Sequence, residues 1–157
     1  MRSSWLAGGV YGTVLASALL AALQSEGERF TPFYDASWVM ITAGTAALAH
    51  GYAHHMATHK PGSGTHRWRQ LGWALADEWP VVIACWPTVA LLVLAGIMGW
   101  PEESVTYTGL TLNAALLFGW GTFAALRAGY RRRSAVLIGV ADAAIGLLIA
   151  AANAVIK

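Results

Sequence analysis

The chain has 157 residues, of which 57% are hydrophobic and 11% are charged. Because a soluble domain carries about 25% charged residues, this composition excludes an ordinary water-soluble domain and predicts an integral membrane protein. The net charge of +2 is too small to indicate nucleic acid as a partner, and the single cysteine, Cys85, excludes a disulfide within the chain.

Five apolar segments are each long enough, at roughly 20 residues, to cross a bilayer as a helix. They lie at about 4–24, 37–58, 79–100, 105–127 and 134–156. The first resembles a signal peptide, but no small-x-small cleavage site follows it, so we interpret it as a retained span. The predicted fold is an all-α bundle of five transmembrane helices, forming one membrane domain over 1–157.

Basic residues predict how this bundle is oriented. With five spans, eight of them lie on the side of the N-terminus and two on the opposite side. The eight are Arg2, Lys60, Arg67, Arg69, Arg127, Arg131, Arg132 and Arg133, and the two are Arg29 and Lys157. The positive-inside rule then predicts a cytoplasmic N-terminus and an extracytoplasmic C-terminus. A four-span chain would mix the two groups, so the asymmetry favours five.

The connection before the third span contains a helical pattern of its own. Trp68, Leu71, Leu75 and Trp79 recur at helical spacing. We expect a short amphipathic helix that lies on the inner membrane surface.

Four of the five histidines lie between His50 and His59, at the end of the second span. On a helix, His50 and His54 share one face while His55 and His59 share another, so each pair can supply two ligands to a metal. The structural alternative is that the last three contact lipid headgroups. For His50, which lies deeper in the span, we favour a functional interpretation, because ionisable residues inside a membrane are usually functional.

Two carboxylates are predicted at the same membrane boundary as the histidines. Asp77 and Glu78 lie at the start of the third span. Together with the histidines they could form a site for zinc, iron or manganese. Otherwise they are ordinary acidic residues at the start of a helix.

Asp142 is the only acidic residue inside a predicted span. Gly146, Ala150 and Asn153 lie on the same helical face. A carboxylate in this position is expected to face the bundle interior or a water-filled path, where it can carry an ion or a proton. The alternative is a neutral Asp hydrogen-bonded to a neighbouring helix.

Other polar side chains are candidates for the same path. Asn113, in the fourth span, is interpreted first as a hydrogen-bonding link between helices. Tyr11 and Tyr52 carry the hydroxyl groups best placed to reach a polar interior.

Stripes of small residues predict where helices approach one another closely. They are Gly8, Gly12 and Ala16 in the first span, Ala49, Ala53 and Ala57 in the second, and Gly121, Ala125 and Gly129 in and just after the fourth. Such stripes serve either packing within one bundle or an interface between subunits, and both remain open.

Two resemblances rest on short motifs. YGTVL in the first span, AHGYA in the second and DEWP before the third are similar to a group of uncharacterised actinobacterial integral membrane proteins, over most of the chain. The topology, together with YGTVLASA, HGYAHHMA, LFGWGTFAALRAGYRRR and AVLIGVADAAIG, loosely resembles the vacuolar iron transporter family. The second resemblance implies a dimer that exchanges ferrous iron or manganese for protons, with Met56 as a metal-contacting methionine.

The chain departs from that family at two points. Thr13 and Val14 stand where the family has an Asp in its first span, and the family's Glu-rich helices between spans two and three are absent. The resemblance therefore supports the topology more than the activity.

These residues favour a homo-oligomer, a dimer or larger, that transports a small cation across the lipid bilayer: a divalent metal ion, a proton, or both. An oligomeric ion channel fits the same residues. The run HxxxHHxxxH is similar to the histidine boxes of membrane di-iron enzymes, so a metal-dependent enzyme is an alternative, although such enzymes need about eight histidines. A b-type haem would require His50 from two subunits, and an accessory subunit without ion traffic is a further possibility.

Overall fold

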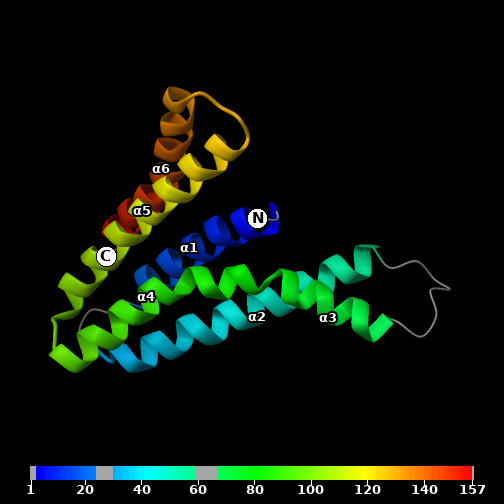
Figure 1. Ribbon diagram of the computed structural model, residues 1–157. Coiled ribbons are helices and arrows are strands. Elements are labelled where there is room, and N and C mark those ends of the chain that lie inside the picture. The colour runs from blue at the N-terminus through cyan, green and yellow to red at the C-terminus, as the bar shows by residue number, and fades with distance from the viewer. Residues whose placement is uncertain (1–2, 24–29, 59–66, 157) are drawn as a thin grey trace.

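The structure is a computed structural model that describes residues 3–23, 30–58 and 67–156, and within these ranges it contains helices and no strand (Figure 1). Proline and acidic residues mark several helix starts, as expected from their preference for the first turn. The helices are α1 (Ser3–Leu23), α2 (Pro32–Thr58), α3 (Arg67–Asp77), α4 (Trp79–Met98), α5 (Glu102–Arg127) and α6 (Arg132–Ile156).

Four stretches among the described residues are helical, long enough and apolar enough to cross a membrane. They are Trp5–Leu23, Gly72–Met98, Glu102–Arg127 and Arg132–Val155. Four of the five predicted spans are therefore confirmed as helices of suitable length and composition. The second predicted span, 37–58, lies within the 27 residues of α2, a less apolar helix that also contains Asp35 and three histidines.

The helices form two antiparallel arms with α1 between them (Figure 1). In one arm α2 packs along α4, and in the other α5 packs along α6. The two arms meet where α4 connects to α5 and diverge toward the opposite end. Helix α1 contacts both α4 and α5, so it holds the arms together.

Glycine determines how closely α1 approaches α4. A Cβ atom on Gly8 would lie 2.8 Å from the Cβ atom of Pro80, and one on Gly12 would collide with the backbone carbonyl oxygen of Val81. The predicted stripe on the first span therefore packs within the bundle, where close backbone contact replaces the hydrophobic effect that lipid cannot supply. In contrast, the second-span stripe of Ala49, Ala53 and Ala57 is exposed.

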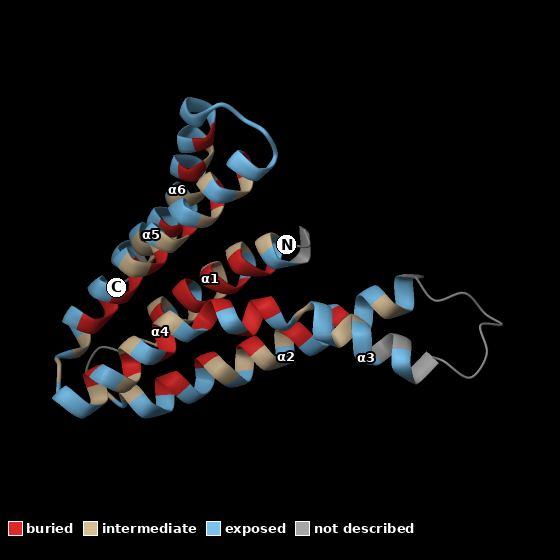
Figure 2. Ribbon diagram, viewed as in Figure 1, coloured by how far each residue is buried: buried red, intermediate tan, exposed pale blue. Residues whose placement is uncertain are grey.

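Buried residues recur every three or four positions along α2, as expected for one side of a helix. Ala36, Val39, Ala43 and Ala47 on this face are each at most 6% exposed and belong to the main apolar core. Large apolar side chains such as Trp38 and Ile41 remain exposed on other faces of α2. Figure 2 shows the same arrangement in the other described helices, with buried stripes turned inward and exposed residues outward.

Helix α3 lies where an amphipathic helix is predicted, and it packs beside the end of α2. A Cβ atom on Gly51 would lie 3.1 Å from the carbonyl oxygen of Ala74 and 3.0 Å from Cδ2 of Leu75. The end of α2 and α3 thus form a hairpin that extends the α2–α4 arm. The position of α3 on a membrane surface stays a prediction.

Candidate functional site

The Asp142 side chain lies in the close contact between α5 and α6. A Cβ atom on Gly121 would collide with Oδ2 of Asp142, so only glycine at position 121 leaves room for the carboxylate. On either side, Gly139 packs against Phe118 and Gly146 packs against Leu117. Three glycines therefore let two helices close around one half-buried carboxylate.

The face of α6 that carries Asp142 is turned toward the bundle. Gly146 is buried, and Asp142, Ala150 and Asn153 are half-buried, whereas Leu137, Leu147 and Leu148 elsewhere on α6 are more than 60% exposed. Ala150 packs against the main core, and the Asn153 side chain has an interaction partner. The predicted polar stripe therefore faces the bundle, with Asp142 and Gly146 in the α5–α6 contact.

Asn113 is fully buried and links α5 to α4. The Thr88 hydroxyl donates a hydrogen bond of 2.9 Å to Oδ1 of Asn113, while Nδ2 of the same amide has no partner. Thr122, next to Gly121 in sequence, also has a buried hydroxyl oxygen without a partner. Buried polar atoms without partners are rare, so both positions are unusual within this apolar bundle.

The described histidines lie on α2, and His50 is next to Tyr11 of α1. The rings of His50 and Tyr11 have centroids 6.1 Å apart at an angle of 38°. His54 is exposed and His55 half-buried, and both have interaction partners. Tyr52 and Met56 are 55% and 56% exposed, so neither lies in a closed interior.

The two predicted carboxylate ligands lie at the junction of α3 and α4. Asp77 is exposed with an interaction partner, and Glu78 is half-buried where its backbone carbonyl accepts a hydrogen bond from Val81. His59 lies outside the described residues. Among the residues that are described, no three side chains of His, Cys, Asp or Glu converge as metal ligands, and the metal site stays a prediction.

Sequence reasoning does not identify Asp35 as a candidate residue. Asp35 lies in the first turn of α2, before the second predicted span, and is 8% exposed. Burial, with a smaller contribution from the Glu102 carboxylate, raises the pKa of Asp35 from 3.8 to about 6. No sequence signal brings Asp35 close to Glu102, because the two residues lie on different helices, α2 and α5.

The raised pKa of Asp35 predicts a pH-dependent stability. The folded protein binds a proton at Asp35 more tightly than the unfolded chain. The contribution of Asp35 to stability is therefore fully present below about pH 4 and is lost as the pH rises through about 6. Asp35→Asn should flatten this decline and raise the melting temperature in detergent above pH 6. The exposed carboxylate of the matched variant Glu103→Gln should leave the decline unchanged. Equal pH profiles for the parent protein and Asp35→Asn would contradict the assignment.

Comparison with known proteins finds no match: no family model, no curated protein and no solved structure is similar to this chain. The candidate residues are therefore interpreted from their own geometry.

Proposed function

We propose that the protein is a multi-pass inner-membrane protein that transports a small cation, either a proton or a divalent metal ion, as a homo-oligomer. The observation that supports this proposal is the Asp142 carboxylate, which is enclosed between α5 and α6 over Gly121. A charged Asp at the centre of a membrane helix costs about 2.5–3.5 kcal/mol. Such residues are retained in membrane helices mainly where they carry ions or protons.

In this proposal, the cation enters from the cytoplasmic end, where most basic connections and the histidine hairpin are predicted. His50, Asp77 and Glu78 attract the ion at the entrance. Asp142 then binds either the ion or a counter-moving proton, about 12 Å along the helix from the start of the predicted span at residue 134. The oligomer covers the large apolar surface of α6 and shields the partly exposed side of the carboxylate.

The five-span topology is part of this proposal. Helix α2 runs along the length of α4. Phe33 packs against Gly96 near the C-terminal end of α4, and Gly51 packs against Leu75 of α3, just before α4 begins. If α4 crosses the bilayer, α2 occupies the same depth, and its exposed Trp38, Ile41 and Leu48 then face lipid. At about 40 Å, the 27-residue α2 exceeds the hydrocarbon core of roughly 30 Å, so its histidine end projects beyond the membrane.

A topology reporter tests the orientation. A periplasm-dependent enzyme fused after Lys157 should be active, because five spans place the C-terminus outside the cytoplasm. A fusion within the α5–α6 connection, after Tyr130, should be inactive and provides the control. Activity only in the second fusion would contradict the five-span proposal.

The function is tested by changing the space around Asp142 without changing the carboxylate. Gly121→Ala puts a methyl group where the Asp142 side chain lies, so Asp142 must move out of the α5–α6 contact. We expect the flux of protons or divalent metals into proteoliposomes, followed with a pH-sensitive dye across a panel of metals, to fall at least tenfold, corresponding to about 1.4 kcal/mol.

Gly119→Ala is the matched control on the same helix. No atom lies within 4 Å of a Cβ atom built on Gly119, so this variant should transport at the parent rate. Equal flux in both alanine variants would show that the α5–α6 contact is not part of the transport path.

A further inference from the structure

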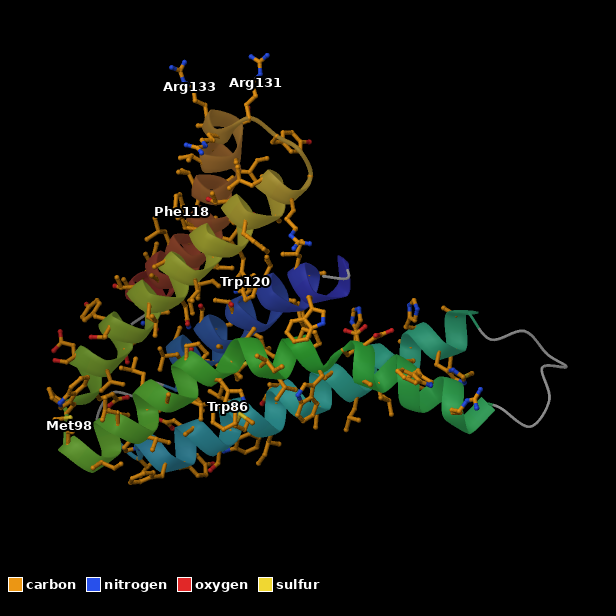
Figure 3. All side chains as sticks on the ribbon, in the orientation of Figure 1. Trp86, Met98, Phe118, Trp120, Arg131 and Arg133 are labelled. Atoms are coloured by element: carbon orange, nitrogen blue, oxygen red, sulfur yellow. The ribbon has the colours of Figure 1, made fainter. Side chains whose placement is uncertain are left out.

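The contacts of α1 with its neighbours bring three polar side chains to similar depth in the bundle. Against α5, Gly9 packs on Trp120, which Figure 3 labels. Leu20 packs on Gly109, and the two contacts together place Ser17 level with Asn113 within about one residue. Against α4, the Cys85 thiol lies 3.3 Å from the carbonyl oxygen of Gly12, which places Thr88 about two residues along the helix axis from the level of Ser17. Ser17, Thr88 and Asn113 therefore lie at similar depth where α1, α4 and α5 meet, and we call these three residues the polar layer.

This polar layer is sealed from the surroundings of the bundle. Thr88 and Asn113 are 0% exposed and Ser17 is 1% exposed. Thr13, one turn away on α1, is also 0% exposed. None of these side chains carries a charge, so the layer is neutral as well as buried.

Hydrogen-bond accounting leaves one amide group of this layer unsatisfied. The Ser17 hydroxyl donates to the carbonyl oxygen of Thr13, and the Thr88 hydroxyl donates to Oδ1 of Asn113. Nδ2 of Asn113 carries two N–H groups and donates to no atom. A buried polar group that loses its hydrogen bonds to water and gains none in the fold destabilises the folded protein.

The chemistry of the layer selects one kind of occupant. If the side-chain amide of Asn113 is flipped, so that Oδ1 and Nδ2 exchange places, Nδ2 donates a hydrogen bond to the Thr88 hydroxyl and Oδ1 is left unpaired. Water can accept a hydrogen bond in the first orientation and donate one in the second. A cation could bind only where the amide carbonyl oxygen is unpaired, and an anion only where Nδ2 is unpaired. No charged side chain belongs to the layer to balance the charge of either ion.

We propose that an ordered water molecule binds in this layer, hydrogen-bonded to the Asn113 amide beside Thr88 and Ser17. Membrane-helix bundles that carry buried polar groups satisfy them with such waters. The site is separate from Asp142: Leu117, which is 0% exposed, lies on α5 between Asn113 and Gly121 and packs against Gly146. The proposal therefore stands independently of cation transport.

Radiolytic hydroxyl labelling tests this site, because radicals formed from a bound water oxidise side chains beside it. Cys85 is a built-in reporter, since it is 0% exposed and lies one helical turn from Thr88. In the parent protein we expect Cys85 to be oxidised despite its burial. In Asn113→Leu, whose side chain is apolar and similar in size, oxidation of Cys85 should fall to the level of the unirradiated sample.

Two further variants make the outcome decisive. Thr111→Val replaces an exposed polar side chain on the same helix and should leave the labelling of Cys85 unchanged. If Asn113→Leu fails to fold, the double variant Thr88→Val with Asn113→Leu removes both hydrogen-bonding partners together and should fold and lose the labelling. Cys85 that stays unlabelled in the parent protein, or is labelled equally in the parent and the apolar variants, overturns the proposal.

Discussion

Asp142→Asn is expected to abolish pH-dependent cation flux while leaving the protein folded and oligomeric. Asparagine keeps the size of the side chain and its ability to hydrogen-bond, so it fits the space over Gly121 that the carboxylate occupies. It can neither bind a cation through a negative charge nor take up and release a proton. The melting temperature should be equal or higher, because a charge is removed from a membrane helix at a saving of up to about 2.5–3.5 kcal/mol.

Flux measurement and thermal unfolding of the same preparation separate the functional effect from a structural one. Glu103→Gln makes the same chemical change at an exposed position of α5 and should transport at the parent rate. If Asp142→Asn transports normally, Asp142 only links two helices, and the path between α5 and α6 is wrong. A variant that loses its oligomeric state would instead assign Asp142 to assembly.

The helices themselves could be predicted from the sequence to within a few residues. The third predicted span starts at residue 79 and α4 begins at Trp79, because Pro80 favours the first helical turn. The second span was predicted to start at residue 37, whereas α2 begins at Pro32. The difference arises because Phe33, Tyr34 and Asp35 are not a continuous apolar run but are still helical, so hydropathy underestimates the length of the helix.

The contacts that build the candidate site were much harder to predict. The hydrogen bond from Thr88 to Asn113 joins residues 25 positions apart, and Gly121 meets Asp142 from a different helix. Apolar residues surround most of these helices, so the hydrophobic pattern does not show which face meets which neighbour. Small residues carry that information: the stripe at Gly8 and Gly12 correctly indicated close packing, but not that α4 is the partner.

The same reasoning explains why the predicted metal ligands could not be evaluated from sequence spacing. His50 and His54 share a helical face, but their distance from Asp77 and Glu78 depends on how the α2–α3 hairpin is set by Gly51 and Leu75. No sequence period encodes that contact. The zinc, iron or manganese site thus remains a hypothesis that the flux assay with a panel of metals addresses directly.

The largest expected effect on stability comes from Gly12→Ala, at the contact between α1 and α4. The added Cβ atom would collide with the carbonyl oxygen of Val81 and lie 2.8 Å from the Cβ atom of Ala84. Backbone atoms cannot move aside as the end of a flexible side chain can, so α1 must shift away from α4. We expect a loss of about 1–3 kcal/mol, which is typical for overpacking in a close-packed interior.

Gly44→Ala on α2 is the matched control, because it adds the same methyl group to a glycine inside a helix where no atom lies within 4 Å. This variant should be unchanged or more stable by about 0.5–1 kcal/mol, since alanine favours helix more than glycine does. Thermal unfolding in detergent compares the two directly. Equal melting temperatures for Gly12→Ala and Gly44→Ala would show that α1 does not pack on α4 through its glycines. Because α1 joins the two arms, its displacement should also lower the flux carried by Asp142 on the far arm.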